Sequence, residues 1–516
     1  MTASTLLLLS LAVPAVGAAV ILLLRYNPNA REAASLVTAG ALFAIVLRIY
    51  LAVSAGDRPA LVLAEPIPGI PIALEAEPLG VLFALVASFL WIVTTMYSIG
   101  YMRGHPLRPE IRDVMATLGI DRDREKRQAR FYLFFAFAIA AVMGVAFAGN
   151  LFTLFVFYEV LTLTTFPLVT HSRSEAARKA GRVYLGVLFT TSVVFQLLAI
   201  VWTYAIAGTL DFQDGGILSG RAAGAVVPVL LGLFVFGIGK AAVMPFHRWL
   251  PAAMVAPTPV SALLHAVAVV KAGVFAVLKV TVYIFGIDFI AATGASVWLM
   301  WVAAATIILA SLVAFTRNNL KVRLAYSTVS QLSYVVLGAM LANQLGVVGG
   351  GMHIAMHAFG KITLFFCAGV IIISTNRTEV SQLKGLGRVM PITFGAFFIG
   401  ALSIVGLPPT GGAWSKWFLG MGSLEAGQIG LVAVLMLSSL LSLVYLMEIP
   451  LQGFFGRPRR APDRAATGDD DHDHGGDFHT PPRWSMAAII TTAVACVILF
   501  LYPEPFYRLM TMVAGP

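Results

Sequence analysis

The forty residues from Phe131 to Thr170 are almost entirely apolar, and Glu159 is the only charged residue among them. A turn signal at Gly149-Asn150 divides them into two stretches, each long enough to cross a bilayer as a helix. A carboxylate at mid-bilayer costs roughly 2.5–3.5 kcal/mol on insertion scales. That cost is tolerated where the charge faces a partner or a hydrated path. The segment therefore predicts membrane insertion together with ion movement.

The rest of the chain repeats this pattern. Of its 516 residues, 59% are hydrophobic and only 12% are charged, and the mean hydropathy is +0.87. No soluble fold of this size needs so many apolar runs, so we expect an all-α polytopic membrane protein with about 14 transmembrane helices. The first run is longer than a signal core and lacks a positively charged start, which favours a permanent span. The expected spans are 4–24, 32–54, 79–101, 131–148, 150–170, 183–207, 225–245, 257–285, 295–316, 323–342, 347–375, 391–420, 426–449 and 484–511.

The net charge of +10 would suit a nucleic-acid-binding protein, but the positions of the charges explain it differently. Loops after odd-numbered spans carry 26 lysines and arginines, whereas the opposite side carries four. Because positive loops stay in the cytoplasm, we expect these loops there and both termini outside. The remaining five positive residues are lysines inside apolar segments: Lys240, Lys271, Lys279, Lys361 and Lys416. They are candidates for a functional role within the membrane, and the alternative, above all for Lys279, is a lysine near a helix end whose side chain snorkels to the membrane surface.

Two of the expected spans share a layout in which prolines and glycines accompany a lone lysine. Lys240 belongs to the first of them and Lys416 to the second. Proline interrupts a helix, and broken backbone at membrane depth survives only when it is buried or lines a hydrated cavity. The two spans are five apart, so the second copy is inverted, which predicts an inverted repeat around a transport path. Two unrelated proline kinks are the alternative. The helix breaks are Pro245 and Pro251 in the first span, and Pro408 and Pro409 in the second.

Histidines and lysines also recur along two other apolar segments. His265, Lys271 and Lys279 belong to one expected helix. His353, His357 and Lys361 stand at i, i+4 and i+8, so one helix face carries all three, with about 6 Å between steps. Rows of this kind suit proton relay. Structural hydrogen bonds are an alternative, and a zinc site lacks a third ligand.

Glu159 is the candidate partner of Lys240. Loss of water weakens the hold of a buried lysine on its proton, and a nearby carboxylate strengthens it. Movement of the partner would therefore switch the lysine between holding and releasing a proton, and the two groups would titrate as a pair. The expected polar axis consists of Glu159, Lys240, Lys271, His357, Lys361 and Lys416.

Four blocks of the sequence resemble the antiporter-like subunits of respiratory complex I and of Mrp-type multisubunit cation/proton antiporters. The first reads GKAAVMPFHRWLPAAMVAPTPVSALLHAVAVVKAGVF, and the others read LKVRLAYSTVSQLSYVVLG, HIAMHAFGKITLFFCAGVII and NLFTLFVFYEVLTLTTFPL. The resemblance covers roughly residues 75–450. The chain departs from the pattern at Asn319, where many relatives carry an aspartate, and at Ala252, where an acidic residue is common. Both positions are close to loops, so they affect the core path little.

The resemblance implies fourteen spans with inverted repeats of spans 4–8 and 9–13. It also implies that Glu159 and Lys240 form the coupling pair, that Lys271 lies on a central axis with His357 or Lys361, and that Lys416 lies at the second half-channel. The expected organisation is 1–130 for the first three spans and a loop, 131–290 and 291–450 for the two repeats, 451–483 for a cytoplasmic loop, and 484–516 for the last span.

The loop at 451–483 contains His472, His474 and His479 among aspartates, which could bind a divalent metal. A flexible solvated loop is the favoured interpretation, because nothing in the sequence fixes the ligand geometry. We therefore expect no metal and no cofactor. There is no cysteine cluster, and no GxGxxG opens a soluble βαβ unit, so redox work would come through partners and no catalytic residue is assigned.

The favoured function is a proton-translocating, antiporter-like membrane subunit of a Mrp-type sodium/proton antiporter. The alternative is a proton-pumping subunit of an NADH-quinone oxidoreductase or a membrane-bound hydrogenase, in which the chain would be part of a translocase. A structural membrane scaffold is a second alternative. Expected partners are other membrane subunits, the lipid bilayer of a bacterial inner membrane, protons and, in the favoured hypothesis, sodium ions, but no nucleic acid.

Overall fold

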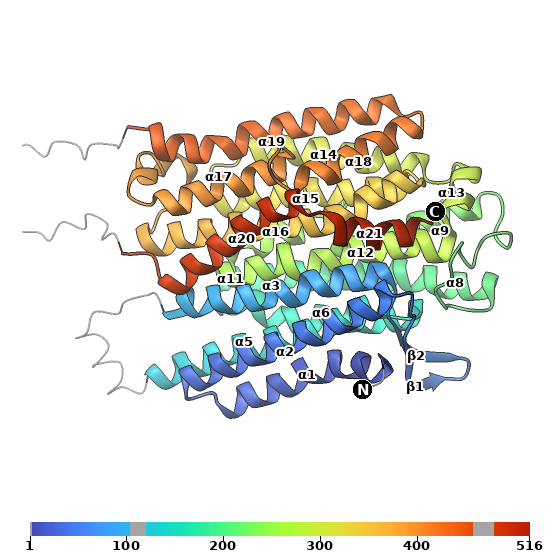
Figure 1. Cartoon of the computed structure of the whole chain (residues 1–516), viewed down its shortest axis with the longest axis horizontal. Helices are drawn as coiled ribbons and strands as arrows, with labels where there is room; N and C mark the ends of the chain where they lie inside the picture. The colour runs from blue at the N-terminus through green and yellow to red at the C-terminus, as the bar shows by residue number, and fades with distance from the viewer. Residues whose placement is uncertain (1–2, 104–119, 458–478, 516) are drawn as a thin grey trace, which may run out of the picture.

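The computed structural model describes residues 3–103, 120–457 and 479–515. Within them the chain forms a bundle of helices that run roughly parallel, with one β-hairpin at the end of the bundle (Figure 1). Eleven helices of the described part are long and apolar enough to cross a membrane. The other three expected spans are the more polar α15 (Leu320–Met340) and two interrupted helices, so the total of fourteen stays a prediction.

The N-terminal part consists of α1 (Ala3–Leu23), α2 (Pro28–Ser54) and α3 (Pro78–Arg103). Between α2 and α3 lies an antiparallel hairpin of β1 (Ala60–Ile67) and β2 (Ile70–Glu75), which sequence analysis did not predict. Main-chain hydrogen bonds join β2 to residues 147–149, with Glu75 N–H donating to the Phe147 carbonyl at 2.7 Å. The hairpin is therefore fixed by a turn far away in the sequence.

The segment expected as the first repeat begins with α5 (Ile120–Ala146) and α6 (Leu151–Val169). The turn predicted at Gly149-Asn150 separates them, and the Asn150 side chain caps α6 by accepting the N–H of Thr153 at 2.8 Å. The following elements are α7 (Glu175–Thr191), η1 (Ser192–Gln196), α8 (Leu197–Ala207), α9 (Val226–Gly237), η2 (Gly239–Ala241), α10 (Trp249–Ala252), η3 (Ala253–Val255), α11 (Thr258–Ala262), η4 (Leu263–Val267), α12 (Val269–Val280), η5 (Thr281–Phe285) and α13 (Ile287–Thr293).

The segment expected as the second repeat contains α14 (Val297–Thr316), α15, α16 (Gln344–Thr375), η6 (Val380–Gln382), η7 (Leu386–Arg388), α17 (Pro391–Val405), α18 (Gly412–Glu425) and α19 (Ile429–Phe455). Asn319 caps α15 by accepting the N–H of Val322, so the asparagine serves at this helix start as an aspartate would. The last expected span, 484–511, is two helices, α20 (Arg483–Leu501) and α21 (Glu504–Ala514). Pro503 is the N-cap of the second helix, and Pro505 stands in its first turn.

Both expected helix breaks are present. The first helix ends at Gly237, and η2, a left-handed Ala242 (φ 54°) and a cis bond before Pro245 follow. Pro251 lies farther on, within α10. The second break lies between α17 and α18, with Gly406 at φ 87° and a cis bond between its two prolines. Glycine adopts that left-handed conformation without steric cost.

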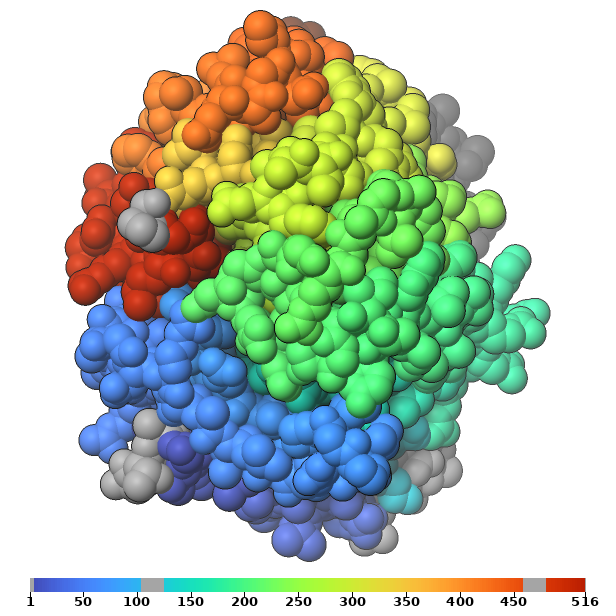
Figure 2. Space-filling view, turned by 90° about the vertical axis from the view of Figure 1, so that its right-hand side faces the viewer, coloured from blue at the N-terminus to red at the C-terminus, as the bar shows by residue number. Residues whose placement is uncertain are grey.

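Two segments form the centre of the bundle. In the segment 258–285, which includes α11 and α12, all residues of the most apolar stretch are buried. The corresponding share is 94% in α16 but only 28% in α2. The three candidate histidines and Lys271, Lys279 and Lys361 belong to these two segments. The end face that carries the hairpin is seen in Figure 2, where the green segment around α8 and α9 covers the middle between the blue N-terminal helices and the yellow-to-orange C-terminal half.

Candidate proton path

Lys240 lies at the first helix break and is fully buried. Its ammonium donates to the carbonyl of Tyr158 at 2.8 Å and to the hydroxyl of Thr162 at 2.6 Å, and it lies over the Tyr158 ring. Its own backbone N–H donates to the Tyr158 hydroxyl at 3.0 Å. Residues 158 and 162 are one turn apart on α6, so a single face of α6 binds the lysine.

Glu159 is the neighbour of Tyr158 on α6, but it does not face Lys240 in the same way. Both carboxylate oxygens are buried and have no hydrogen-bond partner among the described residues. The structure thus holds the expected pair separated, with the ammonium bound to neutral acceptors and the carboxylate free.

Lys271 and His357 are in direct contact at the centre of the bundle. The Lys271 ammonium meets the Nδ1 of His357, and both residues are shielded from solvent. His265 lies in the π-helical turn η4, one turn before α12, and its ring packs against Phe365 with 4.7 Å between centroids. Both of its ring nitrogens lack a partner among the described residues, so His265 is buried with its hydrogen-bonding capacity unused.

The two histidines of α16 form a stacked row. The rings of His353 and His357 are 5.6 Å apart between centroids and inclined by 15°. His353 continues the row, because its Nδ1 lies 2.9 Å from the hydroxyl of Ser415 on α18 and its ring stacks on Tyr334 of α15. The row therefore leads from Lys271 to the second helix break.

Lys361 points away from this row. Its ammonium donates to the Ser327 hydroxyl at 2.6 Å, and the Ser327 hydroxyl also accepts from Tyr445 at 2.9 Å. The hydroxyls of Ser442 and Tyr445 are 3.0 Å apart. Spacing on the helix put Lys361 in line with the histidines, but its side chain reaches toward α15 and α19 instead. The axis therefore has a branch of hydroxyl groups.

Lys416 occupies the second break. Its ammonium donates to the Val405 carbonyl at the end of α17 at 3.0 Å and to the Ser439 hydroxyl at 2.9 Å, and it lies over the Tyr334 ring. The broken helix leaves such carbonyls without intrahelical donors, and a lysine satisfies one of them. Lys416 is partly exposed because it lines a cavity of about 360 Å³ between α18 and α19.

Lys279 does not snorkel. Its side chain is fully buried and forms an ion pair with Glu77 at 3.1 Å, and it donates to the carbonyl of Ala148 at 2.8 Å. The Tyr283 hydroxyl donates to the second oxygen of Glu77 at 3.0 Å. The snorkelling alternative is therefore wrong for this residue, and the pair joins α12 to the start of α3 and the α5–α6 turn.

The acceptors that bind these ammonium groups could not be predicted from the sequence. They are hydroxyls and carbonyls, which occur along every helix and carry no distinguishing signal in one sequence. Among the described residues there is no direct hydrogen bond between Lys240 and Lys271 or between Lys361 and Lys416, so water would have to bridge those steps. The acceptors are Tyr158, Thr162, Ser327, Val405 and Ser439.

The described part of the chain holds no group of three or more histidine, cysteine or acidic side chains placed to bind a metal. Most of the histidine- and aspartate-rich loop, including His472 and His474, lies outside the described residues. His479 is described, and its backbone N–H donates to the Ser374 carbonyl. The metal hypothesis for this loop therefore stays untested.

Residues 148–442 match the family model described as NADH:quinone oxidoreductase/Mrp antiporter, transmembrane. The chain belongs to this family. It is 36% identical to NADH-quinone oxidoreductase subunit N of Desulforudis audaxviator over 73% of this chain and 72% of that protein. It is 29% identical to a Na(+)/H(+) antiporter subunit of Alkalihalophilus pseudofirmus over 67% of this chain and 69% of that protein.

A chain of the Mrp complex from Dietzia sp. has the same fold, with a TM-score of 0.83 at 25% identity over 100% of this chain and 97% of that chain. Several other curated relatives are longer, and this chain spans 36% to 63% of them. The membrane fold and the antiporter-like class expected from the sequence are thus confirmed. The chain is a multi-pass membrane subunit of the kind found in respiratory and antiporter complexes.

Proposed function

We propose that this antiporter-like subunit carries protons along the buried lysines and histidines as part of a Mrp-type sodium/proton antiporter in a bacterial inner membrane. In the proposed topology the loops after odd-numbered spans face the cytoplasm and both termini face outside. The observation that carries the proposal is the Lys271–His357 contact in the most buried helices, in line with the stacked His353. Titratable groups are rare and functional at such depth in a membrane protein.

Lys240 and Glu159 act as the switch in this proposal. Without a hydrogen bond to the carboxylate, the Lys240 ammonium donates only to the Tyr158 carbonyl and the Thr162 hydroxyl. Because a buried ammonium without a counter-charge holds its proton weakly, this separated state favours release toward Lys271. Approach of the carboxylate would favour uptake again. The cycle therefore needs a movement of only one side chain on α6.

From the Lys271–His357 contact the proton has two branches. One follows the histidine row to Ser415, beside Lys416, and the other follows Lys361 to Ser327 and Tyr445. The cavity at Lys416 opens at the side of the bundle. This opening supports a junction with the next membrane subunit, and the multisubunit relatives fit that arrangement.

The alternative is a pump subunit driven by redox partners, and the 36% identity to an NADH-quinone oxidoreductase subunit favours it specifically. The two functions share the path and differ in the energy source. A structural scaffold is the second alternative, and it predicts that loss of the buried charges leaves transport intact.

The test uses the whole complex in inverted membrane vesicles with a pH-sensitive dye. An imposed sodium gradient without a redox donor should move protons in the wild type. Lys240→Ala should abolish this movement and Glu159→Gln should reduce it strongly, whereas Lys384→Ala, at an exposed loop residue, should not change it. Proton movement that requires NADH and ignores sodium would favour the redox pump. Normal transport in Lys240→Ala would leave only the scaffold.

A further inference from the structure

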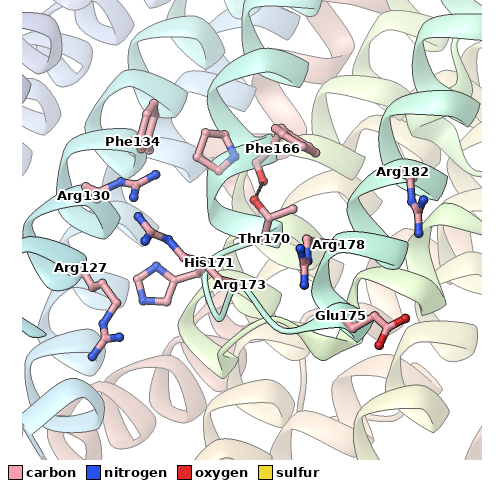
Figure 3. A pocket seen from close by; sticks show the side chains of 11 residues that line it. Arg127, Arg130, Phe134, Phe166, Thr170, His171, Arg173, Glu175, Arg178 and Arg182 are labelled. Atoms are coloured by element: carbon pink, nitrogen blue, oxygen red, sulfur yellow. Dashed lines mark hydrogen bonds between the residues drawn. The ribbon is translucent and has the colours of Figure 1, made fainter. Parts of the chain in front are cut away.

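A cavity of about 740 Å³ lies at the end of the bundle that carries the positively charged loops. It opens between α5, α6 and α7, away from the candidate proton path. Figure 3 shows the side chains of α5 on one side, those of α7 on the other, and His171 with Arg173 between them. Its charged lining consists of Arg127, Arg130, His171, Arg173, Glu175, Arg178 and Arg182.

The charges of this cavity are not balanced within the described residues. Five arginines line the cavity, and Glu175 is the single acidic residue in its lining. None of the five forms an ion pair or a side-chain hydrogen bond in the part of the chain that the structure describes. Five like charges around one hollow repel one another, so the arrangement is stabilised by an anion placed among them.

His171 reports the same excess of positive charge. Burial, together with the charges of Arg127, Arg130 and Arg173, lowers the pKa of His171 to about 4. The imidazole is therefore neutral at physiological pH, and it can accept a hydrogen bond or donate one to an anion. An anion in the cavity would partly offset the field of the arginines.

Part of the cavity lining is apolar and continues toward the membrane. Phe134 of α5 and Phe166 and Pro167 of α6 form this apolar part. Farther along the same helices, Phe137 is 36% exposed and Leu163 is 55% exposed. Spacings of three residues keep Phe134 and Phe137, and Phe166 and Leu163, on one helix face each. An apolar strip thus leads from the charged end of the cavity to the surface that faces the acyl chains.

We propose that this cavity, which we call the arginine cavity, binds the phosphate head group of an anionic phospholipid from the cytoplasmic leaflet. The guanidinium forks match phosphate oxygens, and basic pockets between transmembrane helices on the cytoplasmic side suit anionic head groups. The apolar strip gives the acyl chains a path that an acidic peptide or free phosphate would not need. The leaflet assignment rests on the proposed topology, whereas the preference for an anionic lipid does not rest on proton transport.

The test compares the purified whole complex in nanodiscs of phosphatidylglycerol and of phosphatidylcholine. Native mass spectrometry measures retained lipid, and thermal unfolding measures the change in Tm. The variant is Arg130→Gln with Arg178→Gln, one residue from α5 and one from α7. The matched control is Lys179→Gln with Lys384→Gln, because Lys179 adjoins Arg178 but does not line the cavity.

The wild type and the control should retain phosphatidylglycerol and gain Tm in it. The variant should bind phosphatidylglycerol roughly tenfold more weakly for each lost guanidinium, which corresponds to the lower end of the energy of a hydrogen bond to a charged group. Its Tm in phosphatidylcholine should stay unchanged. Equal retention by variant and control would overturn the proposal. So would an equal Tm gain with inorganic phosphate alone, which would assign the site to free anions. Loss of a partner subunit in the variant, with lipid retention unchanged, would instead assign it to an acidic protein segment.

Discussion

Replacement of Gly273 by alanine tests whether the proton switch depends on the position of the Lys240 backbone. A Cβ at residue 273 would lie 2.3 Å from both the Lys240 carbonyl carbon and the Ala241 nitrogen. Ordinary contact begins near 3.4 Å, so the η2 segment would have to retreat by about 1 Å (3.4 minus 2.3). Backbone cannot rotate out of the way as a side chain can.

This displacement of the η2 backbone would also move the Lys240 side chain and its ammonium. Its bonds of 2.6 Å to Thr162 and 2.8 Å to the Tyr158 carbonyl would stretch beyond hydrogen-bond length if the side chain moved with the backbone. Overpacking costs about 1–3 kcal/mol, and each lost bond to a charged group costs about as much. We therefore expect Gly273→Ala to fold less stably and to lose most of its proton transport.

The assay combines dye-monitored transport in vesicles with thermal unfolding of the purified complex. Gly186→Ala on α7 is the matched control, because a Cβ there meets nothing within 4 Å, and it should transport normally. Wild-type transport and stability in Gly273→Ala would refute the reasoning. It would mean that the packing of α12 against the helix break does not position Lys240.

Three further predictions concern single contacts. Thr162→Val removes one acceptor of Lys240 and should cut transport severalfold, whereas Thr164→Val, which loses only a bond within its own helix, should transport normally in the same vesicle assay. Lys279→Met leaves the Glu77 carboxylate buried without its ion pair and should lower the free energy of unfolding by about 3–5 kcal/mol. Adding Glu77→Gln to this variant should recover part of the lost stability in thermal unfolding. If no stability were recovered, the ion pair would not be the cause of the loss. Because the pKa of His171 is lowered in the folded state, its contribution to stability is present above pH 6.5 and is lost as pH falls toward 4. His171→Gln should therefore show a flatter fall in Tm between these pH values, and an unchanged slope would count against a buried neutral imidazole.

The separated state of Lys240 and Glu159 also gives the proposed switch a structural form. Lys240 is bound by groups that lie one turn apart on α6, while the Glu159 carboxylate between them has no hydrogen-bond partner among the described residues. A rotation of the glutamate side chain is a smaller change than a movement of helices. Such a small movement suits a step that must repeat in every transport cycle.

The sequence by itself determined the membrane class and most of the candidate groups. A charge within hydrocarbon is costly wherever its neighbours lie, so an isolated Glu159 or Lys271 in an apolar run is informative without any knowledge of contacts. Helix breaks are equally local, because proline and glycine act on their own backbone. For the same reason the interruptions near Lys240 and Lys416 could be read from their prolines and glycines.

Only the tertiary structure decided which groups meet. Lys361 donates to Ser327 and not to the histidine row, and Lys279 forms an ion pair with Glu77, which is far from it in the sequence. The charged residues of the arginine cavity come from three separate elements. Hydroxyls and carbonyls that bind an ammonium are common along any helix, so their sequence positions carry no signal. Helix packing, which depends on the shapes of many side chains at once, selects the few that come within hydrogen-bond distance.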